Sequence, residues 1–517
     1  MNRSQATEVP IGLDRAGGRI RNLVIAVFAL AVTIVCWSLS SPPLSTPDEN
    51  WHIANIWCAH GSDESHCIEK NFATATAKYN YAPPMCAHRN ALQPARCATP
   101  SDTSTIGPLF SPDGNYPSTY RELMHQFIGS DGALSILRMK LFNGAVFVLI
   151  LALLFYGAPL KVARSAVTAL TVTLVPFSIW LIASINPSGW GISGVFGVWA
   201  SVSALVHSWF GKSSEETQSR SQQAALMGAF LLSALLATQA RKDVAAMAVV
   251  VVLVLIAELS IRSRHRLFNG KPLIALVALI LASMSLVIRI LENSDFSFFG
   301  FRFPTEFEPL NVSGPTFNVW FTSWVTHFPA VFLDAFGNSG LGEGHEIVVS
   351  RLVVLIGVLV VGGVLFFAST VKSSGQLASL ALLVFAFACI LWFASLEFDL
   401  YNVPGRYVLP LLPVIVGTYV NYSRSPVQLF DVPNIRRITI GLLGVAHALG
   451  LYAVVERYSS GFSGGIRSIP VRFDEWWWDF MPVGPNGIVI LGSIGWIVFL
   501  VYSLRVTEVR AALHGSV

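Results

Sequence analysis

The sequence has few charged residues and almost no excess of either sign. Asp, Glu, Lys and Arg make up 12% of the 517 residues, whereas soluble domains carry about 25%. The net charge is only +4. No basic patch interleaved with aromatic residues and no nucleic-acid-binding motif is present, so we expect no nucleic-acid partner. A nucleotide-binding glycine loop is also lacking, because the GKSS at Gly211 follows Val206 where that loop needs glycine.

Hydrophobic residues make up 53% of the chain and occur in long runs. Such runs are typical of transmembrane helices. We therefore predict an all-α polytopic membrane protein with about twelve transmembrane helices in residues 22–505, flanked by tails at 1–21 and 506–517. Their approximate cores are 22–39, 141–157, 165–184, 189–210, 224–240, 244–261, 272–291, 350–370, 377–396, 406–423, 438–455 and 486–504. The long outer loops are then 41–137, 292–349 and 456–485.

The distribution of basic residues indicates the orientation. With the long first loop left aside, the segments expected inside hold eighteen Lys and Arg residues, and the outer segments and spans hold nine. Cytoplasmic loops of membrane proteins carry the excess of Lys and Arg. We therefore expect both termini in the cytoplasm and the first loop outside.

Four of the six cysteines lie in that first loop, at Cys58, Cys67, Cys86 and Cys97. An even number of cysteines outside the cytoplasm predicts two disulfides, in one of three pairings. The alternative is a metal site, but the spacings fit no usual zinc pattern. Cys36 and Cys389 lie inside apolar spans, where we expect free thiols that only pack.

A helix start follows the first span directly, in the sequence STPDENWHIANIW. Thr46 can cap this helix, Pro47 suits its first position and Glu49 completes a capping box. Asp48 and Glu49 precede His52 by four and three residues, so the three side chains can share one helix face. These are the candidate catalytic residues. In the alternative interpretation, the two acids only cap the helix and complement its dipole.

Cations at the outer ends of later spans need a separate explanation. Arg241 and Lys242 lie in the turn between the fifth and sixth spans, against the positive-inside bias. They are candidates for binding a phosphate, or they pair with Asp243 or Glu49. Arg406 opens the tenth span, where its planar fork can bind a phosphate or a carboxylate.

Three short motifs resemble one family of bacterial polytopic membrane proteins. They are Pro47-Asp48-Glu49-x-x-His52, the polar outer turn at Asn186-Pro187, and Gly405-Arg406-Tyr407-x-x-Pro410. The family is the domain of unknown function 2142 family, and the resemblance covers roughly residues 20–505. The loop with four cysteines departs from the simplest pattern of that family.

The family looks related to the GT-C-type glycosyltransferases, which take sugar from a polyprenyl-phosphate donor. That resemblance implies a GT-C-like fold in the bacterial plasma membrane, to which the cysteine count adds a disulfide-stapled first loop. It implies Asp48 as the base or metal-binding acid, with Glu49 beside it. Glycosyl transfer also needs cations or a metal to stabilise the leaving phosphate, and Arg241, Lys242 or Arg406 can supply that charge. No cofactor is certain, although Asp48 and Glu49 would hold a divalent cation if one binds.

The implied partners are membrane lipid, a polyprenyl-phosphate-linked sugar and an envelope glycan or glycolipid acceptor. Two other functions stay open. One is a transporter or flippase for a lipid-linked or anionic solute, which would place ionisable residues in broken helices near the middle of the membrane. The other is a non-catalytic envelope assembly protein.

Overall fold

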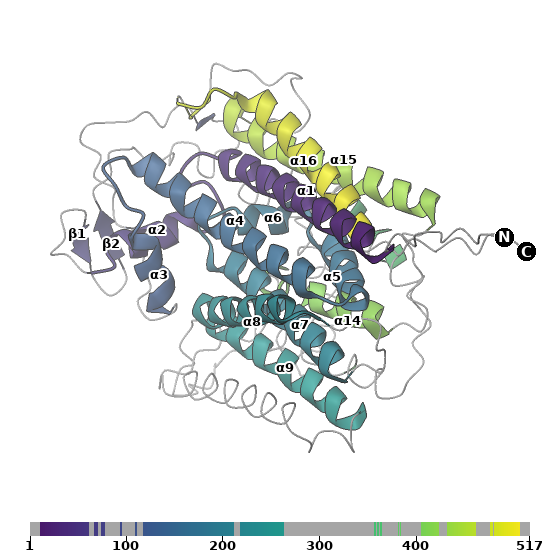
Figure 1. Ribbon diagram of the computed structural model, residues 1–517. Helices are drawn as coiled ribbons and strands as arrows, with labels where there is room; N and C mark the ends of the chain where they lie inside the picture. The colour runs from purple at the N-terminus through teal and green to yellow at the C-terminus, as the bar shows by residue number, and fades with distance from the viewer. Residues whose placement is uncertain are drawn as a thin grey trace, which may run out of the picture.

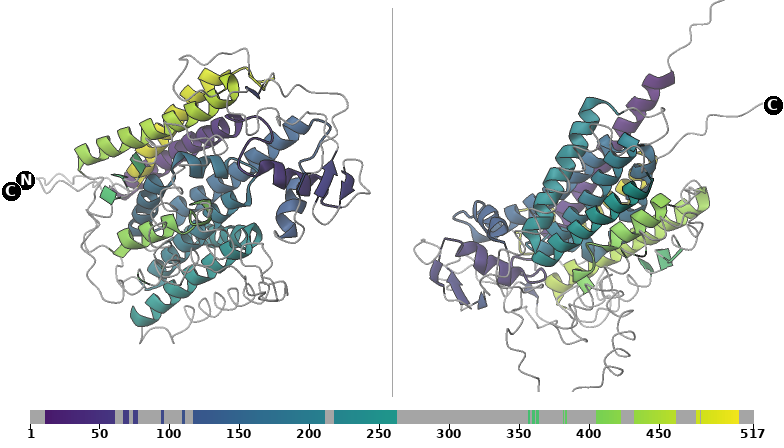
Figure 2. Two further views of the ribbon diagram at one scale, coloured as in Figure 1. Left: turned by 180° about the vertical axis from the view of Figure 1, so that it is seen from behind. Right: turned by 90° about the horizontal axis from the view of Figure 1, so that it is seen from below.

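The computed structural model describes residues 11–60, 67–70, 74–77, 94–95, 109–110, 117–210, 218–262, 405–422, 432–461, 476–478 and 480–506, and isolated residues between 356 and 383. Most of these residues belong to long helices that run side by side through the molecule (Figure 1). Short helices and strands gather at one end of this bundle, on the left of Figure 1, and the views in Figure 2 agree. We call it the Asp48 end, since it carries residues 40–60.

Six helices in the described part are long and apolar enough to cross a membrane. They are α1 (Ile11–Leu39), α4 (Gly132–Gly157), α7 (Pro187–Phe210), α8 (Arg220–Ala240), α15 (Pro433–Ser460) and α16 (Pro485–Val506). The bent pair α5 (Leu160–Thr173) and α6 (Pro176–Ile182) is a seventh candidate. The protein is therefore an all-helical multi-pass membrane protein. The predicted spans at 272–291, 350–370 and 377–396 lie wholly or largely outside the described residues, so the count of twelve stays a prediction.

Two predicted spans are not continuous helices. The span predicted at 165–184 breaks into α5 and α6, which meet at 101°. Pro176 has no N–H to bond the carbonyl of Val172, and Val175 before it takes an extended conformation (φ −69°, ψ 163°). The span predicted at 406–423 starts as the 3-10 turn η4 (Gly405–Tyr407), and α14 (Leu412–Tyr422) follows after a turn that contains Pro410.

Helix α1 packs between two antiparallel neighbours, α16 and α4. Gly495 of α16 lets the backbone of α1 approach so closely that a Cβ there would lie 2.9 Å from the carbonyl oxygen of Ala29. Small residues serve this purpose at helix contacts in membranes. Arg19 near the start of α1 donates to the carbonyls of Phe155 (3.2 Å) and Ala158 (2.8 Å) at the end of α4. A cation thus satisfies the last carbonyls of α4, at the end of the bundle opposite Asp48.

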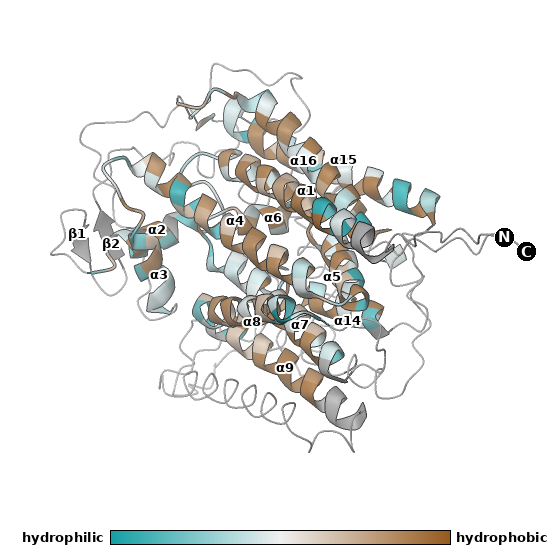
Figure 3. Cartoon of the chain, in the orientation of Figure 1, coloured by the Kyte–Doolittle hydropathy of each residue, from teal (hydrophilic) through white to brown (hydrophobic). Residues whose placement is uncertain are grey.

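Large apolar side chains remain exposed along the outer helices. Figure 3 shows the hydrophobic colour continuing along the long helices of the bundle. Phe28 is 70% exposed, and Leu231 and Ile438 are about as open at 60% and 61%. Lipid-facing surfaces have this composition, whereas α7 is a central helix with 94% of its apolar window buried.

Three short strands lie in the described part of the long segment between α1 and α4: β1 (Cys67–Lys70), β2 (Thr74–Ala77) and β3 (Leu109–Phe110). They form an antiparallel sheet in the order β1-β2-β3. Helices α2 (Glu49–Trp57) and α3 (Ser118–His125) pack beside this sheet at the Asp48 end. The sequence analysis predicted a stapled cap here but no strands, because four-residue strands leave little periodicity to read.

The aromatic residues at 476–478 contribute to the core. Trp478 is fully buried, and its Nε1 donates to the carbonyl of Leu39 at 2.9 Å. The ring of Trp477 contacts Tyr458, with centroids 6.1 Å apart. This part of the chain therefore caps the ends of α1 and α15.

The orientation can be tested with alkaline phosphatase fusions at positions that the fold places at opposite ends. We expect activity after His60 and after Ala240, both at the Asp48 end, and none after Phe210 at the other end. The reason is the excess of Lys and Arg in the segments of that other end. Activity after Phe210 with silence after His60 and Ala240 would show that the orientation is inverted.

Candidate functional site

Side chains from distant elements fix the turn between α1 and α2. The hydroxyl of Tyr458 in α15 donates to the carbonyl of Ser45 at 2.7 Å. Asn186, just before α7, donates through Nδ2 to the carbonyl of Pro47 at 2.7 Å. Its Oδ1 accepts from the backbone N–H of Ser188 at 2.9 Å. The predicted polar turn at Asn186 therefore lies at the Asp48 end and holds the start of α2.

The predicted capping box at the start of α2 is only half formed. Glu49 Oε2 accepts from the backbone N–H of Ser45 (3.1 Å) and of Thr46 (3.2 Å), as such a box requires. The Thr46 hydroxyl makes no hydrogen bond in the described part of the protein, so the reciprocal half of the prediction is wrong. Helix α2 begins at Glu49 rather than Pro47, because Asp48 before it has a left-handed φ of 58°.

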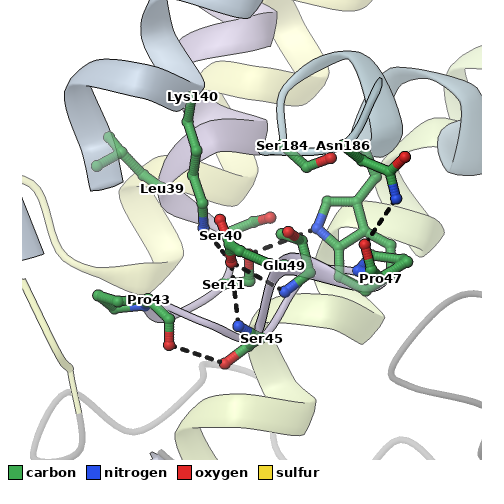
Figure 4. A network of polar contacts seen from close by, with 12 residues as sticks. Leu39, Ser40, Ser41, Pro43, Ser45, Pro47, Glu49, Lys140, Ser184 and Asn186 are labelled. Atoms are coloured by element: carbon green, nitrogen blue, oxygen red, sulfur yellow. Dashed lines mark hydrogen bonds and ion pairs between the residues drawn. The ribbon is translucent and has the colours of Figure 1, made fainter. Parts of the chain in front are cut away.

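The partner of Glu49 was missed by the sequence analysis. Lys140 Nζ of α4 lies 3.3 Å from Glu49 Oε2, and both side chains are fully buried (Figure 4). Glu49 Oε1 has no hydrogen-bond partner among the described residues. Lys140 lies between the predicted first outer loop (41–137) and the predicted span 141–157, and the charge count assigned it to neither side. A lysine at the edge of an apolar run was the available signal.

Asp48 takes a different partner from its neighbour Glu49. Asp48 Oδ2 lies 2.7 Å from Nη2 of Arg406 in η4. The Asp48 side chain is 33% exposed and that of Arg406 is 19% exposed. The structure thus brings together the predicted acid and one predicted phosphate-binding arginine from distant parts of the sequence, and it leaves their carboxylate and guanidinium partly open.

Arg241 is held in a buried network beside this pair. Its Nε and Nη2 donate to the two carboxylate oxygens of Asp243 at 3.0 and 2.7 Å, and its Nη1 donates to the Ser188 hydroxyl at 2.8 Å. Pairing with Asp243 is one of the alternatives left open by the sequence. The Tyr407 ring centroid lies 4.3 Å from the guanidinium carbon of Arg241 and 5.5 Å from that of Arg406. The two arginines therefore share one aromatic ring.

His52 is buried next to these charges. It is 5% exposed, and its ring meets that of Tyr120 edge-on with centroids 6.4 Å apart. Burial lowers the pKa of His52 from 6.5 to about 4. The Asp48 carboxylate opposes this shift in pKa, and the guanidiniums of Arg406 and Arg241 reinforce it. His52 is therefore neutral at pH 7.

A further polar network under His52 was not predicted. Asn143 of α4 donates through Nδ2 to the carbonyl of Ser184 at 2.7 Å and accepts from Trp190 Nε1 at 2.8 Å. The Trp190 ring meets Tyr120 edge-on at 4.7 Å between centroids. A lone asparagine inside a predicted span is the feature that points to such a network.

The cysteine predictions are only partly covered by the described residues. Cys58 is buried and disulfide-bonded. The side chain of Cys67, and Cys86, Cys97 and Cys389 altogether, lie outside the described residues. The pairing of the loop cysteines therefore stays a prediction. Cys36 is a free, buried cysteine, as predicted.

Within the described residues, no group of three or more His, Cys, Asp or Glu side chains could hold a metal ion. Glu49 faces the ammonium of Lys140, and Asp48 faces Arg406, so the two acids do not converge on a shared cation. Lys242 begins α9 (Lys242–Arg262), and its side chain lies outside the described residues.

The arrangement nevertheless offers a definite chemistry. A partly open carboxylate can accept a proton from a hydroxyl group. The planar guanidinium against it can bind phosphate oxygens through two parallel hydrogen bonds. Both groups lie at one end of a bundle of membrane-spanning candidates.

Comparison with known proteins gives one match. A family described as "Predicted membrane protein (DUF2142)" matches residues 30–292. The matched range includes Asp48, Glu49, His52, Lys140 and Arg241 and ends before Arg406, so it is shorter than the resemblance expected from the sequence motifs. No curated protein and no solved structure matches the chain.

The buried ion pair leads to a stability prediction. Lys140→Met leaves the Glu49 carboxylate buried without a counter-charge, which costs about 3–5 kcal/mol. The double variant Glu49→Gln with Lys140→Met removes both charges, and its Gln still accepts from the Ser45 and Thr46 amides. We therefore expect a large fall in the thermal midpoint of the purified single variant and a midpoint near wild type for the double variant. Equal losses in both would refute the pairing.

His52 predicts a pH dependence of stability. Above pH 6.5 the residue is neutral in both the folded and the unfolded state. Between pH 6.5 and about 4 the unfolded chain binds a proton at His52 and the folded protein does not, so stability falls as pH falls. The difference corresponds to about 3 kcal/mol. In His52→Gln, the thermal midpoint should fall less between pH 7 and pH 4.5 than it does in wild type. His60→Gln, at an exposed position, should show the same fall as wild type.

Proposed function

This chain belongs to the domain of unknown function 2142 family of predicted membrane proteins, and on that premise we propose that it is a membrane glycosyltransferase. It transfers a sugar from a polyprenyl-phosphate donor to an envelope glycan or glycolipid at the outer face of the bacterial plasma membrane. Both termini are then cytoplasmic, and the Asp48 end faces outward.

The pair formed by Asp48 and Arg406 carries this proposal. The reaction needs a carboxylate that reaches an acceptor hydroxyl and a cation that reaches the donor phosphate. Asp48 and Arg406 are 2.7 Å apart, and both stay partly open to the surroundings. Glu49 is fully buried against Lys140, so of these two adjacent acids only Asp48 is accessible to a substrate.

In the proposed reaction, the acceptor hydroxyl oxygen attacks the anomeric carbon of the donor sugar. The bond between that carbon and the phosphate oxygen breaks, and the phosphate leaves with the bonding electron pair. Asp48 accepts the proton of the attacking hydroxyl. The guanidinium of Arg406 stabilises the negative charge on the leaving phosphate. No redox change and no further reactant is needed.

The ion pair suggests how the donor enters. In the free protein Arg406 is occupied by Asp48. A donor phosphate competes for the same guanidinium, and its binding releases the Asp48 carboxylate to act as the base. Arg241 is already occupied by Asp243 and Ser188, so it acts through the shared ring of Tyr407, which it helps to hold in place.

The break between α5 and α6 is an observation that favours a transporter. Transporters bind solutes where helices are interrupted. The residues at this break, 173–176, contain no ionisable side chain. An anionic solute would have no counter-charge from that segment, so the enzyme is the better-supported proposal.

The test is the transfer activity of Asp48→Asn. Asn keeps the size of the side chain and tolerates the left-handed backbone, but it cannot take the proton. We expect transfer from radiolabelled polyprenyl-phosphate sugars into envelope fractions to fall about 10²–10⁴-fold per molecule, the usual contribution of a general base.

Glu122→Gln on α3 is the matched control, since it removes an exposed carboxylate of the same outer region that pairs with His60 instead of Arg406. It should keep wild-type transfer. Full activity per molecule in Asp48→Asn would rule out the base and leave the transporter and the assembly protein as explanations.

A further inference from the structure

We propose that Glu49 and Lys140 form a positioning device that holds Asp48 at the site. The inference rests on the proposed function, because it concerns how the base of that reaction is placed. Lys140 anchors the Glu49 carboxylate to α4, and the carboxylate holds the backbone of the turn. Neither residue touches the substrate.

The contacts lead from α4 to Asp48 without a gap. Lys140 Nζ lies 3.3 Å from Glu49 Oε2. The same oxygen accepts from the amides of Ser45 and Thr46, four and three residues before it. Asp48 lies inside the loop that these hydrogen bonds close, at a left-handed φ of 58°. Closing the loop therefore fixes the backbone from which the Asp48 side chain reaches Arg406.

The burial of both charges and the incomplete hydrogen bonding of Glu49 favour a positioning role for the ion pair over a gain in stability. Burying two charges is costly, and a neutral pair is often as stable or more so. This pair leaves Glu49 Oε1 without a hydrogen-bond partner in the described part of the chain. A Gln at position 49 could accept from the same amides without a counter-charge. What the charges add is a direct link between the turn and α4.

That link matters because α4 also carries the network beneath His52. Asn143, one helical turn after Lys140, is bonded to Ser184 and Trp190. The helix is thus fixed to the central part of the bundle. Through Glu49, the same helix sets the position of Asp48. The Asp48 carboxylate and the polar network beneath His52 are therefore both positioned by α4.

The decisive variant is Glu49→Gln with Lys140→Met, which has no unpaired charge and keeps the amide acceptor but loses the link to α4. We expect normal membrane levels, a kcat for transfer lowered by at least about tenfold, and a donor KM close to wild type. A misplacement of about 1 Å costs about 10²-fold in rate, and a base acts in the transition state only. A purely structural role predicts unchanged kcat per folded molecule.

A second measurement needs no activity. Cysteines introduced by Asp48→Cys and Arg406→Cys are bridged with a short bis-methanethiosulfonate reagent, and the linked peptides are quantified by mass spectrometry. The bridging yield should fall severalfold when Glu49→Gln and Lys140→Met are added. Asp131→Ala, which removes the cap that accepts from the Leu134 amide at the start of α4, is the control and should leave the yield unchanged.

The two readouts separate this inference from the proposed function. An unchanged bridging yield together with a wild-type kcat in the double variant would overturn the positioning role, even if Asp48→Asn is inactive. A reduced yield supports the positioning role even if Asp48→Asn keeps full activity, which would overturn the proposed function alone.

Discussion

The buried carboxylate of Glu49 organises the Asp48 end of this protein. It is inaccessible to solvent, yet it holds two amides of the turn between α1 and α2 and faces the ammonium of Lys140. Polar groups in the interior of a membrane protein must be satisfied by other protein groups, since lipid offers none. That one side chain holds the backbone of the tight turn, whereas the left-handed φ of Asp48 sets the late start of α2.

Two arginines extend this arrangement to distant parts of the chain. Arg406 belongs to the short helical turn before α14, and Arg241 belongs to the turn between α8 and α9. Both guanidiniums lie on the ring of Tyr407. Arg241 also reaches Ser188 at the start of α7, so the central helix is connected to the same ring. The candidate site is therefore supported by α2, α7, α9 and the segment before α14 together.

Much of the membrane part could be predicted from composition, because long apolar runs specify transmembrane helices with little ambiguity. The sequence predicted a transmembrane span for each of the six long apolar helices, α1, α4, α7, α8, α15 and α16. The break before Pro176 was missed, although the missing N–H of proline was visible in the sequence. The small sheet was missed because strands of two to four residues carry too little pattern.

For the candidate site, only some of the contacts could be predicted from the sequence. Asp48 and Arg406 could be connected by reasoning that charges at outer span ends share one surface, and they are in contact. The position of Lys140 at the edge of an apolar run marked it as a candidate, but the sequence does not reveal how α4 is rotated about its axis. That rotation decides whether Lys140 faces lipid or the turn. The roles of the site residues in chemistry stay predictions.

The left-handed backbone at position 48 restricts which residue can occupy it. Side chains other than glycine rarely adopt such a φ, and Asn and Asp do so most readily because their short polar side chains bond locally. Glycine has no functional group, Asn has no charge, and Glu is not among the residues that favour this conformation. The shape of the turn therefore leaves aspartate as the one acid suited to position 48, so the backbone geometry and the charge requirement select the same residue.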